Sequence, residues 1–183
     1  MLLADDLAAA DPQTRIRATS VAFYGRTAHA VGTSDGQAER HRQLALCRSV
    51  VAACGGQVAA VYFDEGCRAD HPLDCRPQGQ ALLAALSGPA HPASTLVAAD
   101  AWRLLPRGAP ADGVEILHQL AQRHVLFVLA DTGAAVGTAG EYALLGGLML
   151  GIASSLRTTG AGRCATPLSA VGRVARRPAA SRR

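Results

Sequence analysis

The stretch Val21-Ala22-Phe23-Tyr24-Gly25-Arg26-Thr27-Ala28 is the most informative part of this chain of 183 residues. It begins as a short apolar run, which is typical of a strand buried on both faces, and it continues into an arginine. Side chains alternate along a strand, so positions 26 and 28 should share a face while Thr27 points the other way. The stretch therefore predicts a buried strand that carries a cation to one edge of a sheet and places Ala28, which has no hydroxyl, beside it.

The rest of the chain repeats a pattern of apolar runs and helical segments. The further strand candidates are residues 58–63, 95–99 and 125–130, which are rich in Val, Leu and aromatic side chains. The helical patterns between and after them are residues 37–53, 78–86, 114–123 and 140–156. The glycine pair at 55–56 is placed to close the first helix with a left-handed cap. This alternation predicts an α/β fold in which a parallel sheet is flanked by helices.

The composition predicts an aliphatic core. Hydrophobic residues make up 49% of the sequence and aromatic residues only 4%, so the core must be built from Ala, Leu and Val.

Charge is distributed unevenly along the chain. All 18 basic residues are arginine, which reflects a GC-rich coding bias before any preference for phosphate. Residues 1–156 hold 11 arginines and 14 acids, whereas residues 157–183 hold 7 arginines and no acid. Such a basic tail contacts nucleic acid or another anionic surface in many proteins, and the alternative is a solvated end.

Several functional classes are poorly supported by the sequence. The five cysteines form no C-x-x-C pair and the six histidines have no ligand spacing with them, so we expect no metal, no disulfide framework and no cofactor. The acidic residues near the start do not fit a signal peptide, and glycines interrupt the late apolar run. We expect a reduced, cytoplasmic protein with no membrane contact. A glycine-rich nucleotide fingerprint and a nucleophile elbow are both missing from the sequence.

The stretch 21–28 resembles the first strand of the catalytic domain of serine recombinases, the resolvase/invertase family. In that family the strand ends Tyr-x-Arg-x-Ser; the serine attacks a DNA phosphodiester and the arginine holds the phosphate. Tyr24 and Arg26 match this pattern, and Ala28 occupies the position of the nucleophile. The resemblance covers roughly residues 20–153 and implies a resolvase-like catalytic domain at 19–156. Residues 1–18 are then a disordered lead-in, the long C-terminal helix is truncated, and 157–183 form a basic, disordered tail with no recognisable DNA-reading domain.

The resemblance also implies a set of phosphate-binding residues. Arg76, which precedes a proline that opens the next helix, resembles the family's second phosphate ligand. Arg103 resembles the first arginine of an Asp-Arg-x-x-Arg motif, although Trp102 stands where the acid is usual. Arg107, which comes four residues after Arg103 instead of three, and Asp100 are weaker candidates.

An anion site is also predicted without the resemblance. Ligand sites in parallel sheets lie beyond the carboxyl ends of the strands, and Arg26, Asp64 and Arg103 all fall there. Gln37 and Gln43, on the helix after the first strand, either steady a phosphate or face water. Thr33 and Ser34 are alternative hydroxyl nucleophiles, but their loop is already explained as a turn and a helix start.

These observations leave several functions open. The first is site-specific DNA strand exchange through a phosphoserine, in which the arginines would stabilise the phosphoryl transition state. Ala28 argues that this chemistry is impaired, so the chain is interpreted as a pseudoenzyme related to recombinases of mobile elements, with DNA as its partner. The alternatives are a non-enzymatic DNA-binding module, a dimerisation module that pairs with itself or with a homologous recombinase, and a decayed mobile-element remnant. A flavodoxin-like or receiver-like protein shares the sheet but would not place an arginine after the first strand.

Overall fold

The computed structural model describes residues 11–18, 20–87, 94–107 and 109–161, with the side chains of the last helix described as far as Leu150. Its centre is one sheet with the strand order β2-β1-β3-β4-β5. The strands are β1 (Val21–Arg26), β2 (Val58–Asp64), β3 (Thr95–Ala98), β4 (Leu126–Leu129) and β5 (Ala135–Val136). Strands β1 to β4 are parallel and β5 pairs antiparallel with β4. The predicted α/β fold with a parallel sheet is confirmed, with one short antiparallel strand added at its edge.

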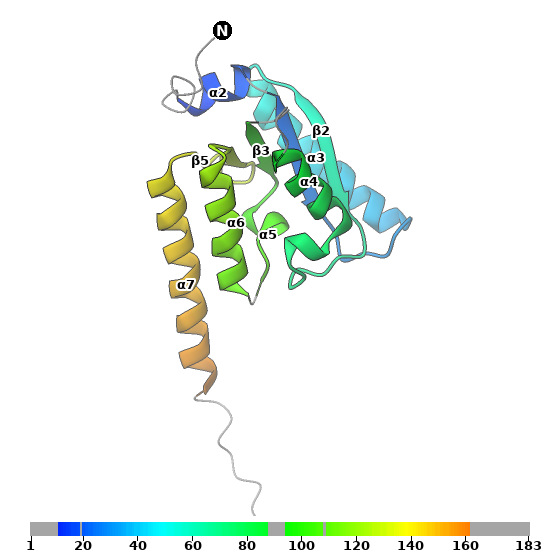
Figure 1. Cartoon of the computed structure of the whole chain (residues 1–183). Coiled ribbons are helices and arrows are strands. Elements are labelled where there is room, and N and C mark those ends of the chain that lie inside the picture. Colours follow the sequence, from blue (N-terminus) through cyan, green and yellow to red (C-terminus); the bar gives the residue numbers. More distant parts are fainter. Residues whose placement is uncertain (1–10, 19, 88–93, 108, 162–183) are drawn as a thin grey trace, which may run out of the picture.

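Helices cover both faces of this sheet (Figure 1). They are α2 (Pro12–Ala18), α3 (Ser34–Ala53), the 3-10 turn η1 (Leu73–Cys75), α4 (Pro77–Ser87), α5 (Ala101–Leu104), α6 (Pro110–Gln122) and α7 (Ala139–Ala161). Helix α7 runs beside α6 and extends away from the sheet (Figure 1). The predicted ends of α3 and α4 are confirmed within a few residues. At the end of α3, Gly55 has a φ of 75°, which is the left-handed cap expected from the sequence.

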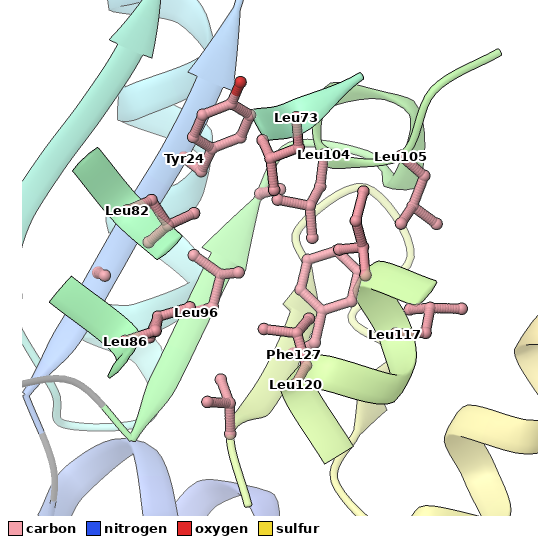
Figure 2. Close-up of a cluster of buried hydrophobic side chains, with 14 of the residues drawn as sticks. Tyr24, Leu73, Leu82, Leu86, Leu96, Leu104, Leu105, Leu117, Leu120 and Phe127 are labelled. Carbon is pink, nitrogen blue, oxygen red and sulfur yellow. The ribbon is translucent and has the colours of Figure 1, made fainter. Parts of the chain in front are cut away.

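The alternation of side chains along β1 divides the core into two clusters. Val21 and Phe23 face α3 and form one cluster with Cys47 and Val51. Ala22 and Tyr24 face the other side, where α4, α6 and α7 supply buried side chains together with β3 and β4. Figure 2 shows this second cluster, in which leucines surround Phe127 and the hydroxyl of Tyr24 lies at its upper edge. The aliphatic core expected from the composition is therefore confirmed, and a polar group of β1 is delivered to the carboxyl edge of the sheet.

Two parts of the chain differ from the sequence-based expectation. Residues 12–18 were predicted as part of a disordered lead-in, but they form helix α2, in which Ile16 and Arg15 are buried. The backbone of Arg15 and the side chain of Thr14 bond to Asp11, and Arg15 also donates to the carbonyl of His124 at 2.6 Å. The last helix continues to Ala161, five residues beyond the predicted end at 156. The rest of the predicted basic tail, residues 162–183, lies outside the described residues, as do residues 1–10 of the lead-in.

Candidate functional site

The charged residues predicted from the sequence gather at the carboxyl edge of the sheet. Arg26 ends β1 and lies in register with Asp64, which ends β2. Asp100 follows β3 and begins α5, which carries Arg103. Parallel strands bring their carboxyl ends to one edge, which is why residues far apart in sequence meet here. The structure thus brings Arg26, Asp64, Asp100 and Arg103 to one place.

Arg26 is enclosed by the loop that follows β2 and by the short helix α5 that follows β3. Its side chain is buried, its Nε and Nη2 donate to the carbonyl of Trp102 at 3.2 and 3.1 Å, and its Nη1 donates to the carbonyl of Cys67 at 3.2 Å. Burial lowers the pKa of Arg26, and the neighbouring guanidinium groups of Arg76 and Arg103 lower it further. In this conformation the Arg26 guanidinium joins the loop after β2 to α5 and presents little surface to a ligand.

Arg76 lies deeper than any other predicted phosphate ligand. Its side chain is fully buried, with a relative exposure of 0%. Nε and Nη2 donate to the carbonyl of His71 at 3.0 and 2.6 Å, and Nη1 donates to the carbonyl of Arg103 at 2.8 Å and to the hydroxyl of Tyr24 at 3.1 Å. A fully charged side chain is buried only where its donors are satisfied, as they are here. Arg76 therefore offers no exposed surface to a phosphate in this structure.

Tyr24 and Asp64 complete the buried network around Arg76. The Tyr24 hydroxyl donates to Oδ2 of Asp64 at 2.8 Å. The Asp64 carboxylate also accepts from the backbone N–H groups of Gln78 at 2.8 Å and Gly79 at 3.1 Å, which belong to the first turn of α4. Burial raises the pKa of Tyr24, and the positive charge of Arg76 partly offsets that rise. Asp64 therefore couples the end of β2 to the start of α4.

Arg103 is the most exposed of the three main candidates. Its side chain is 27% exposed and its Nε pairs with Oδ2 of Asp100 at 2.9 Å. Asp100 also caps α5 by accepting from the backbone N–H of Trp102 at 2.9 Å. The Arg103 Nη1 donates to the carbonyl of Arg26 at 3.3 Å. Asp100 thus has a structural role, and it holds Arg103 at the solvent-facing side of this edge.

A carboxylate that the sequence analysis did not nominate completes the group. Glu39, on α3, is buried and its Oε1 lies 3.1 Å from Nη2 of Arg103. The same carboxylate pairs with Arg42 and accepts a hydrogen bond from Nε2 of Gln43. Gln43 in turn donates to the carbonyl of Arg26 at 3.0 Å. Three arginines (26, 76 and 103) are therefore matched by three carboxylates (39, 64 and 100) at this edge.

Ala28 is exposed directly after β1, and no nearby hydroxyl takes its place in the described conformation. Thr27 is buried, its N–H donates to the carbonyl of Asp64 at 2.9 Å and its carbonyl accepts from Cys67 at 2.9 Å. Thr33 caps α3 by accepting from the N–H of Gly36 at 3.2 Å, and its hydroxyl donates to the carbonyl of Ala30 at 2.9 Å. The prediction that this loop serves as a turn and a helix start is confirmed.

The remaining candidates lie at the surface. Arg107 is exposed, and its guanidinium carbon is 5.4 Å from the centre of the Trp102 ring. Gln37 is also exposed, whereas Gln43 is buried and donates to Glu39 and to the carbonyl of Arg26. Arg107 lies in the segment that follows α5, the helix that carries Arg103.

Glu39 was missed because its partner lies on a distant segment. A signal was nevertheless present, since Glu39 and Gln43 continue the buried seam of Cys47 and Val51 backwards in steps of four residues. Polar side chains on the inward face of a helix must find polar partners. That rule pointed to a buried polar contact, although not to Arg103 in particular.

Two further findings concern the class of site. Among the residues that the structure describes, no group of His, Cys, Asp and Glu side chains is arranged to hold a metal ion. In the same part of the chain no helix has the length and apolar character needed to cross a membrane.

Comparison with solved structures identifies the fold. The chain is similar to the N-terminal catalytic domain of TP901-1 integrase, with a TM-score of 0.57 and 21% identity over 79% of this chain and 98% of that one. It is also similar to a resolvase family site-specific recombinase from Streptococcus pneumoniae, with a TM-score of 0.57 and 13% identity over 79% of this chain and 92% of that one. No protein-family model and no curated protein matches the sequence. The chain thus has the fold of a resolvase-like catalytic domain, as its sequence predicted.

Proposed function

We propose that this chain is a serine-recombinase-like DNA-binding protein whose strand-cleaving chemistry is impaired. The observation that carries the proposal is the exposed Ala28 directly after β1, at the arginine-rich edge of a recombinase-like fold. Strand cleavage in that family needs a serine nucleophile, and a methyl side chain cannot form a covalent phosphoester. Loss of a nucleophile lowers the rate of such reactions by many orders of magnitude.

The surroundings of Ala28 support impairment beyond the missing serine. Arg26 and Arg76 use their guanidinium groups on backbone carbonyls and on Tyr24, instead of leaving them open to a phosphate. Thr27 is buried and Thr33 is engaged as a helix cap. We therefore expect an Ala28→Ser variant to remain unlinked to DNA in a covalent-trapping assay with supercoiled plasmid. Linkage of that variant alone would confine the defect to the missing hydroxyl.

DNA remains the partner that the fold and the charges favour. Arg103 and Arg107 are the more accessible arginines of the candidate set, and the sequence adds seven arginines after residue 156. Contacts of this kind are electrostatic, so binding should weaken steeply as salt is added. Absence of binding at low salt would favour the decayed mobile-element remnant.

The binding test compares Arg107→Gln with Arg48→Gln, an equal loss of charge at an exposed position of α3. We expect Arg107→Gln to weaken binding of a short duplex and to reduce the slope of log affinity against log salt by about one. Arg48→Gln should change neither quantity. Equal effects of the two variants would show that only net charge matters.

A role in self-association is favoured by one surface. Leu144 and Leu148 lie four residues apart on α7 and are 67% and 56% exposed, so they form an apolar strip on a helix that extends from the body of the protein. We infer that this strip packs against a second copy or a homologous recombinase. Sedimentation analysis should show that the double variant Leu144→Glu/Leu148→Glu is monomeric, whereas Leu46→Glu, at a 40% exposed leucine of α3, keeps the native state of association. Unchanged association of the double variant would reject this surface.

The predicted cytoplasmic location is retained as part of the proposal. The four cysteines in the described part of the chain, Cys47, Cys54, Cys67 and Cys75, are free thiols. Free thiols fit a reducing compartment.

A further inference from the structure

We propose that Glu39 is a built-in counter-ion that competes with phosphate for Arg103. It would thereby control access to the arginine edge, which is the group of Arg26, Arg76 and Arg103 at the carboxyl edge of the sheet. The proposal deepens the proposed function, because it concerns how a DNA phosphate would enter that same edge. It rests on the contacts of one buried carboxylate and on the balance of charge around it.

The position of Glu39 brings its carboxylate to Arg103. Its carboxylate is buried, comes from α3, and meets Nη2 of Arg103 at 3.1 Å. Arg103 is more exposed than Arg26 or Arg76, whose donors are turned to carbonyl oxygens. A phosphate arriving from solvent would therefore meet Arg103 first, at the nitrogen that Glu39 already occupies. A carboxylate oxygen and a phosphate oxygen make the same kind of charge-assisted hydrogen bond to a guanidinium.

The net charge of this edge depends on Glu39. With Asp64 beside Arg76 and Asp100 on Arg103, the addition of Glu39 gives three carboxylates for the three arginines 26, 76 and 103, and the exposed Arg42 is not counted in this group. An edge with no excess positive charge offers little attraction to an anion. Without Glu39 the group would hold three arginines and two carboxylates, and Arg103 would keep Asp100 but lose the carboxylate partner of its Nη2.

Glu39 also has another partner. Its Oε2 pairs with Arg42, whose side chain is 76% exposed and lies one helical turn further along α3. If phosphate displaced Glu39 from Arg103, the carboxylate would keep Arg42 as a counter-ion and would not be left unpaired. The exchange therefore avoids the large cost of a buried, isolated charge. Arg42 makes the displacement of Glu39 by an anion feasible.

Gln43 holds the Glu39 carboxylate in place. Its Nε2 bonds both to Glu39 and to the carbonyl of Arg26, whereas its Oε1 is buried without a hydrogen-bond partner in the described structure. The amide orientation is thus set by two acceptors, and it holds the Glu39 carboxylate toward the arginine group. Gln43 is a positioning residue for Glu39.

The test uses inorganic phosphate as the probe and the full chain as the protein. Thermal unfolding is measured over a phosphate series at constant ionic strength for the natural protein, for Glu39→Gln, and for Glu115→Gln. Glu115 is a matched control, because it is an exposed glutamate that accepts a hydrogen bond from a glutamine four residues later, Gln119, on α6. We expect Glu39→Gln to bind phosphate about tenfold more tightly than the natural protein, and Glu115→Gln to leave the affinity unchanged.

A second variant assigns the gain to Arg103. Adding Arg103→Met to Glu39→Gln should abolish the tighter binding, while Arg103→Met alone should change the weak affinity of the natural protein little. Equal phosphate affinity in the natural protein and in folded Glu39→Gln, or a gain that survives Arg103→Met, overturns the proposal. Should Glu39→Gln fail to fold, Glu39→Asp shortens the side chain and keeps the charge, and the proposal then requires a smaller gain in affinity.

A DNA arm separates this proposal from the proposed function. If Glu39→Gln binds phosphate more tightly but no form of the protein binds a short duplex, the counter-ion role stands and DNA binding fails. If the natural protein binds the duplex and Glu39→Gln changes neither phosphate nor DNA affinity, DNA binding stands and the counter-ion role fails.

Discussion

Replacing Asp64 by Asn tests the buried network that joins β1, β2 and α4. Asp64 is 3% exposed and its carboxylate accepts from Tyr24, Gln78 and Gly79 at 2.8, 2.8 and 3.1 Å. Asparagine has almost the same shape, but it offers one acceptor oxygen and one NH₂ group where the carboxylate offers two acceptor oxygens. Whichever way the amide turns, at least one of the three donors then faces another donor.

The magnitude follows from these contacts. If the amide oxygen takes the place of Oδ2, the bonds from Tyr24 and Gly79 persist and the N–H of Gln78 loses its acceptor. A hydrogen bond to a charged group contributes about 1.5–3 kcal/mol, and the two surviving bonds weaken because their acceptor becomes neutral. We therefore expect Asp64→Asn to lower the free energy of unfolding by about 3 kcal/mol.

The assay is urea unfolding followed by far-UV circular dichroism. Asp112→Asn is the control, because Asp112 is an exposed acid in the first turn of α6 and its helix-dipole contribution is at most about 1 kcal/mol. A double-mutant cycle with Tyr24→Phe should give a coupling energy of at least about 1 kcal/mol. A loss below about 1 kcal/mol for Asp64→Asn, or additivity with Tyr24→Phe, would refute the view that this network is a main link between the two strands and α4.

Three further predictions concern packing and thiol chemistry. Gly79→Ala should lower the free energy of unfolding by about 1–3 kcal/mol in urea titrations, because the added Cβ would collide with the backbone oxygen of Leu73. Gly140 lies on α7 with open space around the position of a Cβ, so Gly140→Ala should be neutral or slightly stabilising. Cys47 should resist alkylation at pH 8 in the native state while the exposed Cys75 reacts, because burial raises the pKa of the Cys47 thiol to about 12. Mass spectrometry of the alkylated protein measures both rates. Native labelling of Cys47 at the rate of Cys75 would contradict this prediction. The unfolded Cys47 thiol ionises at a lower pH than the folded one. Its contribution to stability is therefore complete below about pH 8.5 and is lost as the pH rises toward 12. We expect Cys47→Ala to flatten the fall in the free energy of unfolding over that pH range.

Features that are local in sequence were predicted well. The strand from Val21 and the cap at Gly55 follow from apolar runs and from the conformational freedom of glycine, and both are confirmed. The gathering of Arg26, Asp64 and Arg103 also followed from sequence, because parallel strands bring their carboxyl ends to one edge. Such features need no knowledge of how distant segments pack.

The features that were missed depend on tertiary contacts. Strand β5 has only two residues, too few for any periodicity to appear. Arg76 is preceded by a loop that folds over it, so its complete burial could not be read from an Arg-Pro pair. The pairing of Glu39 with Arg103 joins α3 to α5 across the edge of the sheet, and only the folded chain brings these residues together.

We propose that this chain binds DNA but does not break it. The most direct measurement mixes the natural protein with an end-labelled duplex and divides the sample between a native gel and a denaturing gel. We expect a retarded, salt-sensitive complex on the native gel and intact, protein-free strands on the denaturing gel. Labelled strands covalently attached to protein on the denaturing gel would show that another residue attacks the phosphate, and no complex on the native gel at low salt would remove DNA as the partner.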